Sequence, residues 1–291
     1  MARDLAFGIS VTPYAATYPQ IVEQVLVAEA GGLDLVGIQD HLYQRRFLDT
    51  FSLLADLLAR TSRLRFFPDV ANLPLRSPPM IAKAAASMDV MSGGRFELGL
   101  GKRHLLGRRG RHGRTAAASR RGLHGARAIA IIRSALDGQR VARGDGVHYP
   151  VPGYPPGPPP AHRVGIWLGV YGPRGLRLAG RAADGWIPSL GYMGPEAFSR
   201  ASATIDEAAV KAGRDPDEIR RIYNLSGAIT DGPRGDDHLT GPVEHWVSTL
   251  SSWATEIGVD SFIFWPPDGD LDQVRLFAEE VTSAVRRAAA R

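Results

Sequence analysis

Residues 165–189, GIWLGVYGPRGLRLAGRAADGWIPS, restrict the fold more than any other part of the chain. The apolar run 166–168 predicts a strand, which leads into a turn of small residues. A helix pattern follows, with Leu176, Leu178 and Ala182 on one face, and a second short strand is predicted at 185–188. Strand, turn, helix and strand in this order form the βαβ unit of a parallel sheet.

Apolar runs and amphipathic helix patterns alternate along the whole chain. Strands are predicted at 5–11, 35–38, 64–71, 96–100, 165–168, 185–188, 222–229 and 261–265. Helices are predicted at 18–30, 50–60, 78–91, 128–136, 173–182, 195–212, 242–257 and 271–288. Eight strands, each followed by a helix, indicate an α/β fold with a parallel sheet and helices outside. For 291 residues we expect one closed (β/α)8 TIM barrel over residues 1–291, because no GxGxxG motif of an open sheet follows the first strand.

Composition excludes several classes of protein. The chain has no cysteine, which rules out disulfide frameworks, zinc–thiolate sites and thiol nucleophiles. No apolar run approaches the ~18 residues of a membrane span, and the first residues lack the apolar core of a signal peptide. The motifs HExxH, GxSxG and Walker A are missing, as is an acidic cluster with metal-ligand spacing. We therefore expect a cytoplasmic protein with no metal.

Two segments depart from the alternation of strands and helices. Residues 138–163 are rich in glycine and proline, with PGYPPGPPP at 152–160, and are expected to form an ordered surface loop or lid. Residues 102–127 contain nine lysines or arginines and no acidic residue. Subtracting these nine charges from the net charge of +5 leaves −4 for the remainder. The basic segment is therefore foreign in composition to the rest of the chain.

Three motifs in order resemble the bacterial-luciferase-like family of flavin- or F420-dependent oxidoreductases, which are (β/α)8 barrels. They are GIQDHLY at 37–43, AKAAASMDVMSGGRFELGLG at 82–101 and YGPRGLRLAGRAADGWIPS at 171–189. The resemblance covers nearly the whole chain except 102–127. It implies hydride transfer at C5 of F420, or monooxygenation with reduced FMN, on a small organic substrate. It also implies a possible homodimer. Within this family, the Arg-, Ala- and Gly-rich composition favours F420 over FMN, because it indicates a GC-rich gene of the kind found where F420 is common.

The basic segment 102–127 leaves three interpretations open. Written in GC-rich codons and read one base later, it yields Ser-Ala-Thr-Ser-Trp-Asp-Ala-Val-Ala-Gly-Met-Gly-Gly-Pro, which resembles family elements at this place. We favour such a frameshift, although freedom among synonymous codons makes it a fit and not a proof. If the segment is frameshifted, the chain as written is expected to form a barrel with an impaired cofactor site. A nucleic-acid-binding arm is disfavoured, because the segment has no aromatic residue for base stacking.

The resemblance assigns roles to residues that end the second and third strands. His41, which follows Asp40, is the candidate catalytic residue, lying against the cofactor ring as proton donor or charge stabiliser. A loop histidine hydrogen-bonded to Asp40 is the alternative. A cis peptide bond is expected at Asp69–Val70, supporting the ring from behind, and Asn72 could bond the ring edge. An ordinary strand exit is the alternative there.

The turn before the helix at 173–182 is the candidate phosphate cradle. Backbone N–H groups at a helix start, together with the helix dipole, favour an anion. Trp186 is interpreted as half core and half cofactor-pocket wall, and Glu97 as a structural carboxylate paired with Arg65. The cradle candidates are Gly169, Tyr171, Gly172, Pro173, Arg174 and Ser189. Since other catalytic sets are missing, the reaction chemistry is expected to come from the cofactor.

Overall fold

The structure is a computed structural model, and it describes residues 4–101, 117–140, 151, 153–235 and 239–289. For residues 117–124 and 289 it describes the backbone only. The basic segment between 102 and 116, including the expected frameshift, lies outside the described residues. No described helix is long and apolar enough to cross a membrane.

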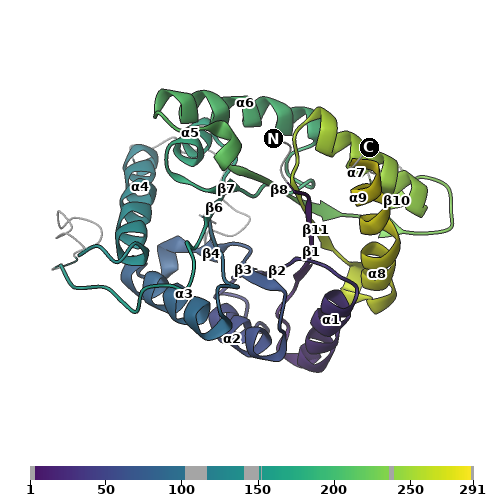
Figure 1. The fold of residues 1–291 in the computed structure, drawn as a ribbon, viewed down its shortest axis with the longest axis horizontal. Helices are drawn as coiled ribbons and strands as arrows, with labels where there is room; N and C mark the ends of the chain where they lie inside the picture. Colours follow the sequence, from purple (N-terminus) through teal and green to yellow (C-terminus); the bar gives the residue numbers. More distant parts are fainter. Residues whose placement is uncertain (1–3, 102–116, 141–150, 152, 236–238, 290–291) are drawn as a thin grey trace.

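Parallel strands form a barrel at the centre of the molecule (Figure 1). Its order is β3-β2-β1-β11-β8-β7-β6-β5-β4. β3 and β4 are two parts of the third strand, and a bridge between Phe66 and Phe96 joins β3 to the start of β5, which closes the ring. The strands are β1 (Ala6–Val11), β2 (Leu35–Ile38), β3 (Arg65–Pro68), β4 (Ala71–Asn72), β5 (Leu98–Gly101), β6 (Ile166–Gly169), β7 (Gly185–Trp186), β8 (Arg220–Ser226) and β11 (Ser261–Trp265). The predicted (β/α)8 barrel is confirmed.

Helices surround the barrel (Figure 1). They are α1 (Tyr18–Ala30), α2 (Thr50–Arg60), α3 (Pro78–Ser92), α4 (Ala117–Leu136), α5 (Pro173–Ala182), α6 (Pro195–Lys211), α7 (Val243–Glu256), α8 (Leu271–Leu276) and α9 (Thr282–Ala289). A π-helical turn, Phe277–Val281, divides the last predicted helix into α8 and α9. Short 3-10 turns occur at Ala15–Thr17, Leu73–Leu75, Pro216–Glu218 and Pro267–Gly269.

The seventh strand is shorter than predicted. β8 ends at Ser226. At the next residue, Gly227, the chain bends into close contact with the segment around Leu239. Only a glycine fits there, because a Cβ would lie 2.2 Å from the Leu239 carbonyl oxygen. The next two residues form β9 (Ala228–Ile229), which pairs with β10 (Thr240–Gly241) outside the barrel. The prediction of one continuous strand over 222–229 was therefore wrong beyond 226.

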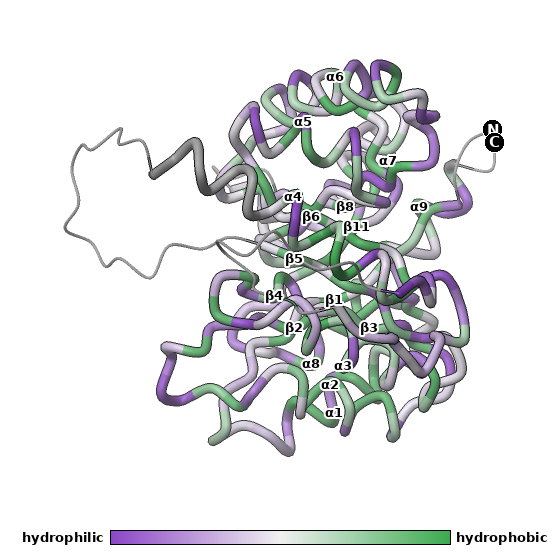
Figure 2. The backbone as a smooth tube through the Cα atoms, turned by 90° about the vertical axis from the view of Figure 1, so that its left-hand side faces the viewer, coloured by the Kyte–Doolittle hydropathy of each residue, from purple (hydrophilic) through white to green (hydrophobic). Residues whose placement is uncertain are grey.

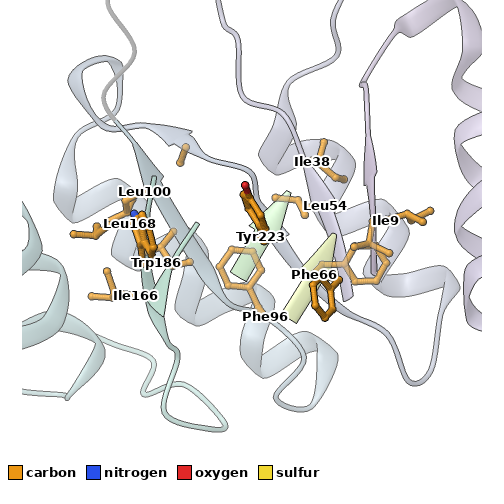
Figure 3. Packing of buried hydrophobic residues seen from close by; sticks show 14 of the residues in the cluster. Ile9, Ile38, Leu54, Phe66, Phe96, Leu100, Ile166, Leu168, Trp186 and Tyr223 are labelled. Carbon is orange, nitrogen blue, oxygen red and sulfur yellow. The ribbon is translucent and has the colours of Figure 1, made fainter. Parts of the chain in front are cut away.

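Two layers of apolar residues hold the fold together. The larger cluster lies between strands and helices and includes Phe66, Phe96 and Trp186 (Figure 3). The smaller one fills the barrel interior and consists of Ala6, Leu35, Phe67, Trp167, Ile187, Ile222 and Ile263. Figure 2 shows mainly hydrophobic strands at the centre of the molecule and hydrophilic stretches on the helices and outer loops. Both faces of the barrel strands are thus buried, as parallel sheets require.

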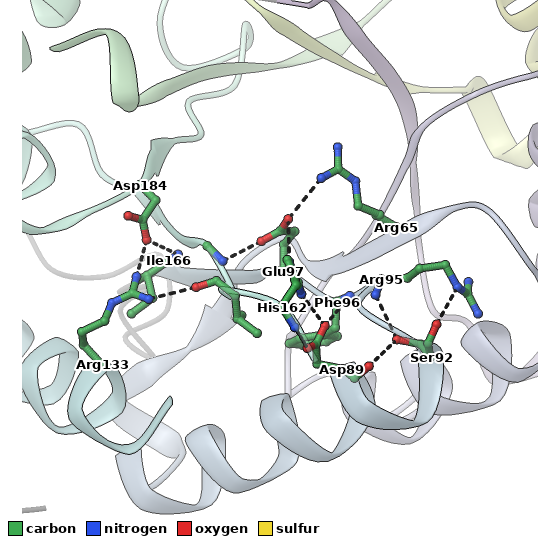
Figure 4. Close-up of polar contacts among 12 residues, drawn as sticks. Arg65, Asp89, Ser92, Arg95, Phe96, Glu97, Arg133, His162, Ile166 and Asp184 are labelled. Atoms are coloured by element: carbon green, nitrogen blue, oxygen red, sulfur yellow. Dashed lines mark hydrogen bonds and ion pairs between the residues drawn. The ribbon is translucent and has the colours of Figure 1, made fainter. Parts of the chain in front are cut away.

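A network of charged groups joins elements at the N-terminal end of the barrel (Figure 4). Glu97 Oε1 lies 3.4 Å from Arg65 Nη1, and Glu97 Oε2 accepts the Gly165 N–H at 2.6 Å. The expected Glu97–Arg65 pair is therefore confirmed. His162, which the sequence reasoning missed, lies between two carboxylates, with Nδ1 2.7 Å from Asp89 Oδ1 and Nε2 3.4 Å from Glu97 Oε1. Hydrogen bonds to Asp89 and Glu97 raise the pKa of His162 to about 9.

This network anchors the end of the Gly/Pro-rich segment 138–163. The His162 backbone N–H also donates to Asp89 Oδ2 at 3.0 Å. Further back, the Lys83 ammonium on α3 donates to the Gly157 carbonyl at 2.5 Å. The described residues of the segment therefore pack on α3 and on the N-terminal end of the barrel, which favours the surface-loop interpretation for them over the lid.

Candidate active site

A cavity of about 810 Å³ opens at the C-terminal ends of the barrel strands. Active sites of barrel enzymes lie on this face, because loops from every strand converge there. The lining residues come from the ends of seven of the eight barrel strands and the loops after them. They are Gln39, Asp40, His41, Asp69, Val70, Asn72, Gly101, Gly169, Tyr171, Ile187, Ser189, Gly191, Tyr192, Met193, Asn224, Leu225, Ser226 and Trp265.

The third strand is interrupted at the cavity. The Asp69–Val70 peptide bond is cis, as expected from the resemblance. Glycines at the ends of β5 and β6 leave room for the Val70 side chain. A Cβ on Gly101 would lie 2.1 Å from Val70 Cγ2, and one on Gly169 would lie 3.1 Å from the same atom. Gly169 therefore lines the cavity and also makes space for Val70.

Several buried polar atoms around the cavity have no hydrogen-bond partner among the described residues. Both side-chain atoms of Asn72 belong to this set, as do Asn224 Oδ1 and Trp265 Nε1. Buried polar groups are normally paired, and an unpaired one costs free energy. The atoms of this set near the cavity would therefore gain hydrogen bonds from a bound molecule with complementary donors and acceptors.

A chain of polar contacts runs from the buried part of the cavity to its exposed edge. The Asn224 Nδ2 group donates to Asp69 Oδ1 at 3.1 Å and lies 3.4 Å from Ser189 Oγ. The Ser189 backbone N–H donates to the Tyr171 hydroxyl at 3.1 Å. Burial raises the pKa of Asp69 to about 6, although the Asn224 amide and the Ser10 hydroxyl oppose this. Burial likewise raises the pKa of Tyr171.

His41 lies at the cavity edge, half-buried. Its Nδ1 is 3.0 Å from the Tyr43 hydroxyl. The neighbouring Asp40 is buried and engaged elsewhere: Arg76 Nη2 lies 2.9 Å from Asp40 Oδ1, and the Asn72 N–H donates to Asp40 Oδ2 at 2.9 Å. The Asp40–Arg76 pair thus fixes the backbone on which His41 and Asn72 stand.

The turn before α5 lies beside the cavity and is open to solvent. Gly172 occupies the N-cap of α5 and Pro173 its first turn. A Cβ on Gly172 would meet no atom within 4 Å. Gly172, Pro173 and Arg174 are exposed and do not line the cavity, whereas Tyr171 and Ser189 do. An anion at this helix start would therefore lie at the cavity margin.

Trp186 requires a correction. It is completely buried in the layer between strands and helices, and its ring lies 4.8 Å from that of Phe198. Its indole N–H donates to the Val170 carbonyl at 2.8 Å. It is not part of the cavity lining. Trp186 therefore supports the chain after β6 from outside the barrel, and the expected contribution to a pocket wall is not observed.

Sequence reasoning missed Asn224, Tyr192 and Met193. Asn224 was detectable in principle, because it is a polar residue within the apolar strand β8. Tyr192 and Met193 belong to the loop after β7, and nothing in their spacing indicates the cavity. Within the described parts of the chain, no group of three or more His, Asp or Glu side chains could hold a metal ion.

Comparison with known proteins gives a consistent picture. Residues 5–234 match the family described as luciferase-like monooxygenase. The F420-dependent glucose-6-phosphate dehydrogenase of Nocardia farcinica is 30% identical over 231 residues, 76% of this chain and 68% of that protein. The 5,10-methylenetetrahydromethanopterin reductase of Methanolobus tindarius is 31% identical over 221 residues, 74% of this chain and 63% of that protein.

Solved structures show the same fold. The coenzyme F420 dependent tetrahydromethanopterin reductase of Methanopyrus kandleri superposes with a TM-score of 0.79 at 18% identity, covering 97% of this chain and 99% of that one. The barrel, the cavity at its C-terminal face and the family match over residues 5–234 all point to the same family. The chain belongs to the luciferase-like monooxygenase family.

Proposed function

We propose that this chain is an oxidoreductase that binds F420 in the cavity and transfers a hydride to or from a small organic substrate. FMN is the alternative cofactor, with monooxygenation as the reaction. The observation that carries the proposal is Asn72, a buried side chain in the cavity whose amide oxygen and nitrogen both have no partner among the described residues. The F420-dependent glucose-6-phosphate dehydrogenase of Nocardia farcinica, at 30% identity, supports the choice of cofactor.

The cavity residues fit a flavin or deazaflavin ring. Both rings carry an edge on which carbonyl acceptors alternate with an N–H donor. The Asn72 amide offers one donor group and one acceptor, and Asn224 Oδ1 offers a second acceptor. Val70 adds an apolar surface against which a flat ring can lie. When bound, reduced F420 would supply a hydride from its C5 position and oxidised F420 would accept one there, whereas reduced FMN would supply electrons for oxygen chemistry.

The remaining roles fall to residues at the cavity edge. His41 would give or take a proton at the substrate, since an imidazole exchanges protons near neutral pH, and its contact with the Tyr43 hydroxyl at the cavity edge supports this role. The N-terminal turn of α5, with Gly172 at its N-cap and Pro173 in its first turn, would receive a cofactor phosphate through the other backbone N–H groups of that turn. We extend the proposal to a cytoplasmic homodimer that does not act on nucleic acid.

Titration with F420 and with FMN, in parallel, tests the proposal. We expect F420 to bind with a Kd in the micromolar range and Asn72→Ala to weaken binding at least about ten-fold, because the variant loses two charge-neutral hydrogen bonds. Lys211→Ala, on the exposed face of α6, is the control and should bind as the original chain does. Tight FMN binding without F420 binding would favour the monooxygenase alternative. Binding of neither cofactor would contradict both.

A chain with segment 102–127 recoded in the other frame forms a second arm. Binding by the recoded chain alone would mean that the chain as written has an impaired cofactor site. Equal binding by both would show that the basic segment is tolerated. Retardation of DNA at low salt, lost in the recoded chain, would instead support the nucleic-acid alternative.

A further inference from the structure

The cavity holds a buried carboxyl group, that of Asp69, to which the proposed function gives no role. Its side chain points into the barrel, where a Cβ on Gly37 would lie 3.2 Å from Asp69 Oδ2. Oδ2 is buried and makes no hydrogen bond with the described residues. Oδ1 accepts the amide N–H of Asn224 at 3.1 Å. The carboxyl group is therefore in direct contact with one cavity residue, Asn224.

The two ends of the Asn224 amide differ in their surroundings. Nδ2 faces Asp69 Oδ1 and Ser189 Oγ, whereas Oδ1 is buried and unpartnered among the described residues. An ionised carboxylate can only accept hydrogen bonds, so it requires the amide nitrogen on its side. The amide oxygen is then left as an acceptor for a ligand. A protonated carboxyl group can also donate, and it removes this requirement.

We propose that Asp69 is a positioning residue whose ionised carboxylate holds the Asn224 amide with its oxygen available to an N–H or O–H donor of the bound molecule, and whose protonation releases that orientation. The part that concerns the bound molecule rests on the proposed function. The part that concerns the amide does not, because it is a property of the protein alone.

Both protonation states are accessible near neutral pH. Burial raises the pKa of Asp69 to about 6. The neighbouring elements contribute neutral groups: the Ser10 hydroxyl from β1 and the Asn224 amide from β8, which both act to lower this pKa, and Gly37 from β2. Asp40 is paired with Arg76. The other titratable groups that line this cavity are the His41 imidazole and the hydroxyls of Tyr171 and Tyr192. Burial raises the pKa of Tyr171.

The sequence permits a direct test, because Asn72 and Asn224 are its only asparagines. Labelling asparagine side chains with ¹⁵N yields signals from two amide NH2 groups in the full ligand-free chain. The variant Asn72→Ser assigns them, because it removes the signals of one group. From about pH 4.5 to about pH 8 we expect the Asn224 signals to shift with one inflection near the pKa of Asp69. The Asn72 signals, from a buried amide in the same cavity, are the internal control and should not follow that inflection.

Asp69→Ser should abolish the inflection, and Asp69→Glu should restore a pH-dependent shift. Asn224 signals that stay constant across this range in the unmodified chain would overturn the proposal, as would an inflection that persists in Asp69→Ser. The unmodified chain alone decides the first point, so a poorly folded variant does not weaken the test.

The second arm measures the Kd of F420 and of FMN over the same pH range. We expect the unmodified chain to bind its cofactor about ten-fold more tightly above the inflection than below it, because the ionised carboxylate holds the Asn224 amide oxygen towards the ligand. In Asp69→Ser the affinity should not depend on pH over this range. An NMR inflection without binding of either cofactor would leave the positioning role intact and refute the proposed function. Binding that is independent of pH would refute the link between the Asn224 amide and the cofactor.

Discussion

Replacing Asp69 by asparagine should make the fold more stable above about pH 6. The substitution hardly changes the shape of the side chain. The new amide oxygen can still accept the Asn224 N–H that Asp69 Oδ1 accepts at 3.1 Å. The principal change is the loss of a buried group that ionises.

The magnitude follows from the pKa of Asp69, which burial raises from the ordinary value of 3.8 to about 6. Below 3.8 both the folded and the unfolded chain bind the proton, and the residue does not favour unfolding. As pH rises from 3.8 through about 6, the unfolded chain releases the proton first, and stability is progressively lost. The difference between these two pKa values corresponds to about 3 kcal/mol of stability. Asp69→Asn should recover up to this amount above pH 7 and little at acid pH.

Urea denaturation at about pH 5 and about pH 8 measures the difference in the free energy of unfolding between the two chains. Asp272→Asn is a matched control, because Asp272 is largely exposed and pairs with Arg275 on the same helix turn. We expect no comparable pH-dependent gain from it. A smaller free energy of unfolding for Asp69→Asn at about pH 8, or a difference that does not grow with pH, would refute the reasoning.

Two further predictions concern the other end of the barrel and the fit around Val70. His162→Gln should destabilise the fold by about 2 kcal/mol at about pH 6 and by little at high pH. The value allows for solvent screening of this partly exposed side chain. Urea denaturation at both pH values measures the loss. The stabilisation is complete below the ordinary pKa of 6.5 and is lost as pH rises through about 9, so equal losses at both pH values would argue against it. Gly101→Ala should cost about 1–3 kcal/mol by overpacking against Val70, with most of the loss recovered in the double variant with Val70→Ala. Gly172→Ala, where a Cβ meets nothing within 4 Å, is the control, and strictly additive losses for Gly101 and Val70 would contradict the steric explanation.

The barrel and the position of the site could be predicted from the sequence because each depends on local patterns. Apolar runs separated by helix patterns specify strands and helices one at a time. The C-terminal ends of parallel strands necessarily converge, so residues that end different strands meet there. His41, Asp69, Asn72 and Ser189 were identified as strand-end residues, and all four line the cavity.

The orientation of side chains on the strands was harder to predict. Barrel strands are buried on both faces, so apolar alternation does not distinguish the barrel interior from the layer beneath the helices. Trp167 lies in the interior cluster, whereas Trp186 lies in the outer one. Both are tryptophans in short apolar strands. Their different positions depend on register within the closed ring, which local sequence does not specify.

Contacts between distant segments were also beyond local patterns. His162 follows a proline-rich stretch and reads as a loop residue, yet it bridges Asp89 and Glu97 from 65 or more positions away. Asn224 meets Asp69 from 155 positions away. Only the closure of the barrel brings these groups together.

Alternate residues of the strands place three kinds of group in successive layers of the barrel interior. Arg65, Phe67 and Asp69 follow one another at intervals of two, from the N-terminal end towards the cavity. The first layer is an ion-paired network, the second is apolar, and the third has polar atoms without partners among the described residues. An asparagine at position 69 could keep the contact with Asn224 without the cost of a buried charge. A carboxyl group there departs from the rules of stable packing, and such departures are expected where a site requires a particular chemistry. The paired charges at the opposite end, around His162 and Glu97, supply stability away from the cavity, so the polar third layer can serve the bound molecule.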